Sequence, residues 1–406
     1  MQEKVGLKRS LGLVSLTFYG LGTIVGAGIY VLIGEVAGVA GVFLPLSFLL
    51  AGLIAIFTAL SYAELSTRFP VCAGEAVYVE QAWHLRRLSA LTGWMIILTG
   101  VVSAAAIANG FVGYINLFFD MSRSVAIIGL VLALSAIAIL GIQASVVTIF
   151  LITLIEVAGL LYVIIFSFNA EAVNQFDMVS LSTSKYGING IVMGSFLAFY
   201  AFIGFEDMVN VIEEVKQPAR NFPIAILLAI VLSVIFYCAV SIAALRIISP
   251  EQLSQSAAPL ADLISLAGGN PAFIGMISLL AVINGGLVQI IMGSRVLYGM
   301  ANNSMAPAFL SVVNIMTKTP VYATLIICFC VMSFALLLPL AKLAQLTSLI
   351  MLLVFILINL ALIVIKSRVG SAYKGLSIPI WVPIVGATSS AVLVVYQALI
   401  LKSLLE

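Results

Sequence analysis

The chain has 406 residues, 63% of them hydrophobic and 8% charged, with a net charge of +2. Soluble domains carry about 25% charged residues, so this composition excludes a soluble globular protein and indicates a chain whose solvent is the lipid bilayer. The small, scattered charge argues against a nucleic-acid partner. Four cysteines and one histidine argue against a disulfide framework or a zinc cluster, so we expect no metal and no cofactor.

Eleven apolar stretches are about 20 residues long or longer, which is the length that crosses a bilayer as a helix. In chain order they are residues 12–37, 43–66, 88–116, 124–142, 147–168, 188–212, 222–246, 271–301, 320–339, 343–365 and 379–401. The loops between them are short, and we expect no attached soluble domain. We therefore predict an all-α polytopic membrane protein with about eleven transmembrane helices.

The distribution of lysine and arginine predicts the orientation of the chain, because cytoplasmic loops of membrane proteins are enriched in both residues. If the N-terminus is cytoplasmic, thirteen of the 18 basic residues fall on the cytoplasmic side and the other five fall outside. We therefore expect a multi-pass protein of the plasma (inner) membrane with a cytoplasmic N-terminus. The odd number of spans would then place the C-terminus outside.

The first span holds a cluster of glycines at its centre. Residues 20–34 read GLGTIVGAGIYVLIG, with an apolar half-helix on either side of residues 26–28. A helix that is interrupted inside the bilayer exposes backbone groups that lipid cannot satisfy, so such a break persists only where it lines a cavity. The alternative is close helix packing through the pair Gly22 and Gly26. A break would favour a transporter over a simple anchor.

The sixth span, residues 188–212, has a second interruption. Gly204 lies within it and is followed by Glu206 and Asp207. Because the two interrupted spans are five apart, which is an odd number, the second group of five helices would insert upside down relative to the first. We expect one transporter domain with three parts: a first repeat at 12–168, an inverted second repeat at 188–365 and an additional helix at 379–401.

Four motifs resemble the amino acid–polyamine–organocation (APC) family of transporters. They are GAGIY (26–30), SYAELSTRFP with AGEAVYV (61–70 and 73–79), FIGFED with EEVKQPARNFP (202–207 and 213–223), and SRVLYGMANNSMAP (294–307). The resemblance covers nearly the whole chain. It implies a leucine-transporter-like five-plus-five fold with broken helices 1 and 6, alternating access without ATP, and amino acid or amine substrates.

The chain departs from the pattern of the family in three places. Members often have twelve spans, and eleven are counted here. Where many members have Arg-Asp-Gly after the eighth helix, this chain has Asn302-Asn303-Ser304. Several proton-coupled members carry a lysine in the fifth helix, and the aligned position here is Glu156. This last departure bears on which ion is coupled to transport.

The glycines of the first break are suited to bind a carboxylate. Gly26, Ala27 and Gly28 would present backbone N–H groups at the start of the second half-helix, whose dipole favours an anion. Small residues are needed there because the ligand must approach the backbone closely. We expect a leucine at position 28 to fill this site and to leave the fold intact.

The resemblance implies the remaining contacts of the substrate. The backbone carbonyls of Ile24, Tyr200 and Ile203 would accept hydrogen bonds from the substrate ammonium, next to Gly204 in the second break. The Tyr200 ring matches an aromatic gate over the substrate, although it could also be an ordinary packing residue. Glu206 matches an acidic position that some members use in gating, although it could instead cap a half-helix.

Glu156 lies inside the apolar stretch IFLITLIEVAGLLYVIIFSF, about 15 Å of helix from the cytoplasmic end. The resemblance places it against the first and eighth helices, where related transporters hold sodium or a lysine ammonium. A protonated Glu156 could donate to backbone carbonyls there, and proton binding would then favour one access state. The alternative is a permanently neutral structural hydrogen bond, for example to Asn284. We predict that Glu156 couples transport to protons.

Glu64 and Arg68 are four residues apart at the inner end of the second span. This spacing places both side chains on one face of a helix and predicts an ion pair on the helix surface. We assign the pair no role in transport.

The sequence thus predicts a secondary active transporter of amino acids, coupled to protons and working as a monomer. An amino acid exchanger and a cationic amino acid or polyamine transporter are the alternatives. A channel would need a continuous polar lining, and a transporter-like sensor would be expected to carry a signalling domain. The spans contain no pattern such as HExxH, so we expect no enzyme.

Overall fold

The structure is a computed structural model that describes residue 9 and residues 11–70, 74–140, 146–171, 187–369 and 375–405. Across these ranges the chain is helical and forms no β-strand, only one isolated bridge between Leu11 and Val215. Most of the predicted external loop 169–187, the end of the fourth predicted span at 141–142 and Cys72 lie outside the described residues.

The described residues up to 169 form six helices and one short 3₁₀ segment. They are α1 (Leu13–Ala40), η1 (Gly41–Phe43), α2 (Leu44–Arg68), α3 (Gly74–Trp83), α4 (Arg86–Ile115), α5 (Arg123–Leu140) and α6 (Val146–Asn169). The second half continues with α8 (Gly187–Ala198), η2 (Phe199–Phe202), η3 (Glu206–Glu214), α9 (Pro218–Ile247), α10 (Pro250–Gln255), α11 (Pro259–Leu266), α12 (Pro271–Asn302), η4 (Ala308–Ser311), α13 (Val321–Leu337), α14 (Leu340–Val369) and α15 (Trp381–Leu405).

Within the described ranges, nine helical segments are long and apolar enough to cross a membrane. The difference from the eleven predicted spans has two causes. The second half of α1 continues through η1 into α2 as one segment, Gly28–Arg68, and α13 has only 17 residues. Each of the eleven predicted stretches still lies on a helix of the structure, so the chain is an all-α polytopic membrane protein.

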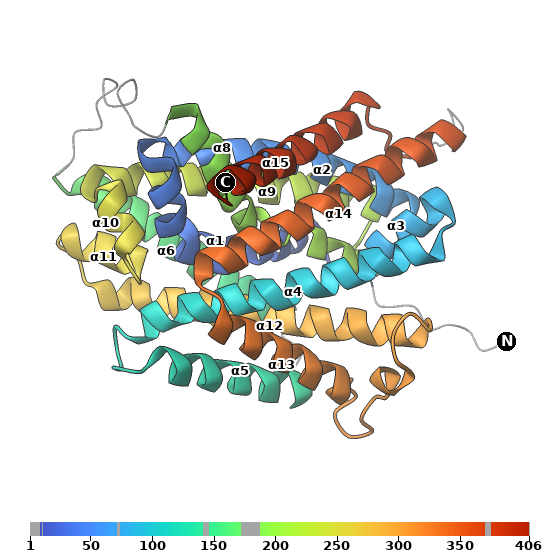
Figure 1. Ribbon diagram of the computed structural model, residues 1–406, viewed down its shortest axis with the longest axis horizontal. Helices are drawn as coiled ribbons and strands as arrows, with labels where there is room; N and C mark the ends of the chain where they lie inside the picture. The colour runs from blue at the N-terminus through green and yellow to red at the C-terminus, as the bar shows by residue number, and fades with distance from the viewer. Residues whose placement is uncertain are drawn as a thin grey trace.

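The longest described helix, α12, packs side by side with α4 across the molecule (Figure 1). Along the lower edge of the same view, α5 and α13 pack against each other and against α4. On the other side, α15 lies on α14 and α2. The first helix, α1, contacts α4, α6, α8, α9 and α12, so the predicted first broken span lies among the helices of both halves.

Both predicted interruptions are present in the backbone. In α1 the helix is broken at Gly26, which has non-helical torsion angles. In the sixth span the α-helix ends at Ala198, and the chain continues as two 3₁₀ segments separated by Ile203, Gly204 and Phe205. Gly204 has a φ of +125°, and a Cβ there would lie 2.3 Å from the carbonyl oxygen of Thr23. Glycine is therefore required at 204, and the two breaks are in direct contact.

The segment before α1 is attached to the segment after η3. The N–H of Leu11 donates to the carbonyl of Glu214 at 3.0 Å, and the N–H of Lys216 donates to the carbonyl of Leu11 at 2.8 Å. These bonds fasten the start of the first broken span to the end of the second.

The predicted surface pair of Glu64 and Arg68 is instead a buried charge cluster. The Glu64 carboxylate is fully buried and bonds Arg68. It also accepts hydrogen bonds from Nζ of Lys366 at 2.8 and 2.9 Å and from the N–H of Ile378 at 2.8 Å. The helix-surface interpretation is therefore wrong, because the end of α14 and the start of the α15 region cover this face of α2. The cluster ties three helical elements together.

Candidate functional site

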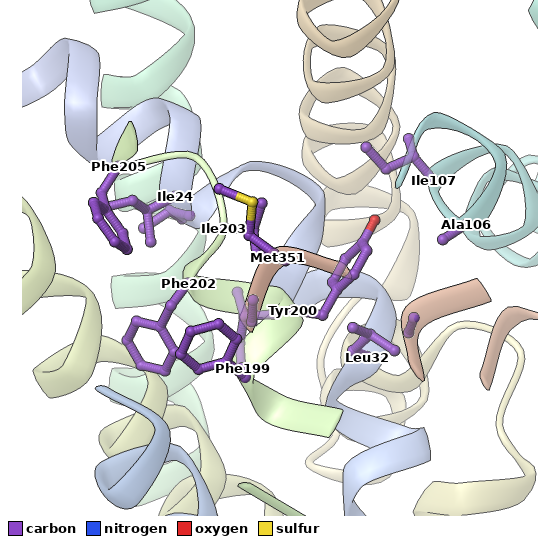
Figure 2. Close-up of a cluster of buried hydrophobic side chains, with 14 of the residues drawn as sticks. Ile24, Leu32, Ala106, Ile107, Phe199, Tyr200, Phe202, Ile203, Phe205 and Met351 are labelled. Atoms are coloured by element: carbon purple, nitrogen blue, oxygen red, sulfur yellow. The ribbon is translucent and has the colours of Figure 1, made fainter. Parts of the chain in front are cut away.

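A cavity lies where the two breaks meet. It is lined by residues of α1, α4, the second broken span and α12, namely Gly22, Thr23, Ile24, Gly28, Ser103, Ile107, Tyr200, Ile203, Asn284, Gly285, Val288 and Gln289. Four of the predicted substrate-binding residues are among them: Ile24, Gly28, Tyr200 and Ile203. In Figure 2, Ile24 and Ile203 lie close together at the breaks, and the Tyr200 ring points toward the α4 side, where Ile107 lies.

The three other predicted binding residues are placed differently. A Cβ added at Gly26 would meet no atom within 4 Å, so Gly26 faces open space at the break. Gly204 packs against the backbone of Thr23 and donates its N–H to Oε2 of Glu206 at 2.9 Å. The side chain of Ala27 lies outside the described part of the chain.

Gly28 has a packing role that the sequence analysis did not foresee. A Cβ at this position would lie 2.8 Å from Cα of Ala201, in the second broken span. The expectation that a leucine at 28 would leave the fold intact is therefore wrong, because the two broken helices would have to move apart. Gly28 lines the cavity and also permits the contact between the helices.

Two tyrosine hydroxyls hold the breaks in place. Tyr237 of α9 places its hydroxyl 2.8 Å from the carbonyl oxygens of Ile24 and of Ala201, one in each broken span. Tyr200 donates its hydroxyl to the carbonyl of Ser103 at 3.1 Å and accepts from Oγ of Ser103 at 3.2 Å. The predicted gate residue Tyr200 is thus bonded to α4, and one of the predicted ammonium acceptors, Ile24, is already approached by Tyr237.

The sequence analysis did not assign several residues in and beside the cavity. Tyr237, which bonds both breaks, lies in an uncharged stretch. The small residues around Ser103 indicate close packing on the substrate path but do not single out Ser103. Gln289 of α12 lines the cavity and is buried, and its amide oxygen has no hydrogen-bond partner within the described part of the chain. A polar residue inside an apolar span is the one signal that could have identified Gln289.

Glu156 is fully buried on α6. Neither carboxyl oxygen has a hydrogen-bond partner among the described residues, although Asn284 lies beside it. Its own backbone carbonyl accepts a hydrogen bond of 2.6 Å from the Tyr30 hydroxyl of α1. One turn earlier on α6, Thr153 lies against Gly22 of α1. The structure thus places Glu156 between the first broken span and α12.

Glu206 lies just after the second break and is buried. Its bond to the Gly204 N–H is the capping interaction that was considered as the alternative to gating. Capping does not exclude a gate, and the gating role of Glu206 stays a prediction.

Comparisons with known proteins identify the family of the chain. A family model described as "Amino acid permease" matches residues 11–404. The branched-chain amino acid permease BcaP of Bacillus subtilis is 31% identical over 92% of this chain and 85% of its own length. The vacuolar cationic amino acid transporter 2 of Arabidopsis thaliana is 30% identical over 89% of this chain and 60% of its own length.

A third relative is named for a different substrate. The methylthioribose transporter of Bacillus subtilis is 27% identical over 95% of this chain and 87% of its own length. The relatives are thus named for branched-chain amino acids, cationic amino acids and a thiosugar. The family model and the relative that is 31% identical show that the chain belongs to the amino acid permease family of the APC transporters.

Proposed function

We propose that this protein is a secondary active transporter that moves amino acids across the plasma (inner) membrane by alternating access. The observation that carries the proposal is the contact between the two broken spans beside a single cavity. We further propose that the fold is the five-plus-five inverted repeat, with repeats at 12–168 and 188–365, a cytoplasmic N-terminus and a monomer as the working unit.

In this proposal the α-carboxylate of the substrate binds the N–H groups of residues 26–28, at the start of the second half of α1. The ammonium group binds the carbonyls of Ile24, Tyr200 and Ile203. Every amino acid shares both groups, so the side chain must be selected elsewhere. Ser103, Ile107 and Gln289 line the same cavity from α4 and α12 and are the candidate walls for that selection.

We propose that protons drive the transport through Glu156. Its carboxyl is buried next to Asn284 and close to the broken span. An ionised carboxylate without a hydrogen-bond donor is costly in such a place, whereas the protonated form can donate to a carbonyl. Gaining or losing this proton would change the relative stability of the two access states and so couple proton flow to transport.

The test is uptake into proteoliposomes. A panel of leucine, lysine, alanine and putrescine is offered with an inward proton gradient, an inward sodium gradient or neither. We expect accumulation of at least one amino acid with the proton gradient alone. Accumulation only with sodium would refute proton coupling, and uptake only against a preloaded amino acid would identify an exchanger. No uptake of any amino acid would overturn the proposed function, and uptake of putrescine alone would favour the polyamine alternative.

Two glycine-to-alanine variants separate binding from packing at the first break. Gly26→Ala places a methyl group in open space where the carboxylate would approach, so we expect about a tenfold or greater loss of substrate affinity. Gly28→Ala forces the Cβ against Ala201, so we expect a loss of stability of about 1–3 kcal/mol. Substrate titration and thermal unfolding of the purified variants measure the two effects. Wild-type affinity in a folded Gly26→Ala variant would contradict the carboxylate site.

A further inference from the structure

A second cavity borders the first. It lies between α3, α4, η3, α12 and α14, and it is lined by Glu75, Ala76, Gly93, Ile96, Thr99, Glu206, Asp207, Asn210, Gln289, Met292, Val296 and Met351. Gln289 lines both cavities, so a group leaving the central cavity past this residue would enter the second one. The cavity leaves about 30 Å³ for the centres of water molecules, which is room for about two waters or one group of that size.

Three carboxyl groups line this second cavity. Glu75 of α3 is 7% exposed, and Glu206 and Asp207 of η3 are 6% and 5% exposed. No lysine, arginine or histidine is among its lining residues. Carboxyl groups gathered in a buried place without a counterion are costly in their charged form, and a bound cation or protons would relieve that cost.

Two buried oxygen atoms at this cavity have no hydrogen-bond partner among the residues that the structure describes. They are Oδ2 of Asp207 and Oε1 of Gln289. Gln289 is 7% exposed and lies on a different helix from the carboxyl groups. Its unpartnered oxygen is therefore an independent indication of a ligand that donates a hydrogen bond. An unsatisfied buried acceptor costs free energy that a ligand with N–H donors would recover.

Two other charged groups, Arg295 and Glu214, do not line this cavity. Both interact electrostatically with Tyr19, as Asp207 also does. Tyr62 of α2 lies beside Glu75 and Glu206 and contributes no charge to pair with them. A cationic ligand would therefore meet the carboxyl groups without competition from a basic side chain in the lining.

We propose that the second cavity binds a protonated primary amine. An ammonium group has three N–H donors, carries one positive charge and is about the size of a water molecule, so it matches a site of carboxylate and amide oxygens. Resting on the proposed transport function, the ammonium group of the transported amino acid occupies this site after it leaves the central cavity. Glu75, Asp207 and the oxygen of Gln289 are the proposed acceptors.

Binding at this site depends on pH. Burial raises the pKa of Glu75, which lies outside the membrane-spanning segments, to about 7. Below that pH Glu75 is neutral and attracts an ammonium group less strongly, and above it the charged form attracts the group more strongly. Amine affinity is therefore expected to rise between pH 6 and pH 8, while the amine itself stays protonated over this range.

The experiment is a calorimetric titration of the purified full-length protein with methylammonium chloride at pH 8 and at pH 6. We expect saturable binding that is tighter at pH 8. Glu75→Gln and Asp207→Asn should each weaken it by about tenfold or more, because each removes a charged acceptor. The matched control is Glu80→Gln, which changes an exposed carboxyl on the same helix. Tetramethylammonium, which has no N–H donor, should not bind.

Thermal unfolding and titration with a transported amino acid check that each variant is folded and that its central cavity works. Loss of methylammonium binding in a folded Glu75→Gln variant supports the site. No saturable methylammonium binding to the wild type, or equal binding by all variants, would overturn the amine site and leave the transport proposal intact. Failure of amino acid uptake would overturn the transport role but would not change the result with methylammonium.

Discussion

Glu156→Gln is expected to abolish proton-driven accumulation of amino acids and to preserve exchange of amino acids across the membrane. Glutamine keeps the size and polarity of the side chain and cannot gain or lose a proton. A gradient of one pH unit supplies about 1.4 kcal/mol per proton, which supports about tenfold accumulation by a one-proton symporter. Without a titrating group this coupling is lost, and the substrate should only equilibrate.

The measurement compares gradient-driven uptake with counterflow in the same proteoliposomes. The control is Glu35→Gln, which changes a carboxyl of α1 that lines a separate cavity together with Arg123. We expect this control to accumulate substrate like the wild type. If Glu156→Gln keeps both its accumulation and the wild-type pH profile, the carboxyl is structural and its neighbour Asn284 is a packing partner only.

Glu64→Gln is expected to cause the largest loss of stability. The Glu64 carboxylate is the common partner of Arg68 and Lys366 and also accepts the N–H of Ile378. The variant takes the carboxylate partner away from the Lys366 ammonium, which is 12% exposed, and removing one member of such a cluster costs about 3–5 kcal/mol. The effect is measured by heating the purified protein and following the fraction that stays monodisperse at each temperature.

Glu80→Gln again serves as the control, because Glu80 is exposed on α3, and it should change stability little. A second variant tests the reason for the effect. When Lys366→Met is added to Glu64→Gln, the ammonium group that lost its carboxylate is removed, so part of the lost stability should return. A Glu64→Gln protein that unfolds at the wild-type temperature would show that the cluster contributes nothing to stability.

The sequence was most informative where membrane physics restricts the backbone. Glycines inside a span predicted the break at Gly26 and the irregular segment at Gly204, and both are confirmed. The helical class is also confirmed, because stretches of this length and hydrophobicity have few alternatives in lipid. The count of spans differed only where α1 continues into α2 and where α13 is short.

Contacts between distant parts of the chain could not be predicted. The spacing of Glu64 and Arg68 indicated a pair on one helix, but Lys366 lies 302 positions later and nothing in the local pattern points to it. Likewise, Tyr237 reaches carbonyls of both breaks from a helix that showed only an apolar pattern. The close approach of Gly28 to Ala201 depends on how the two broken spans cross. The sequence pattern of a single span does not contain that information.

The backbone bonds of Leu11 have a mechanical consequence. Leu11 lies two residues before α1, and its partners Glu214 and Lys216 lie at the end of η3 and just beyond it. A force on the N-terminal segment is therefore transmitted to the first interrupted span through the chain and to the second through these hydrogen bonds. Under the proposed alternating access, opening at this end would separate these bonds, so a rigid crosslink between the two segments is expected to slow turnover without occupying the cavity.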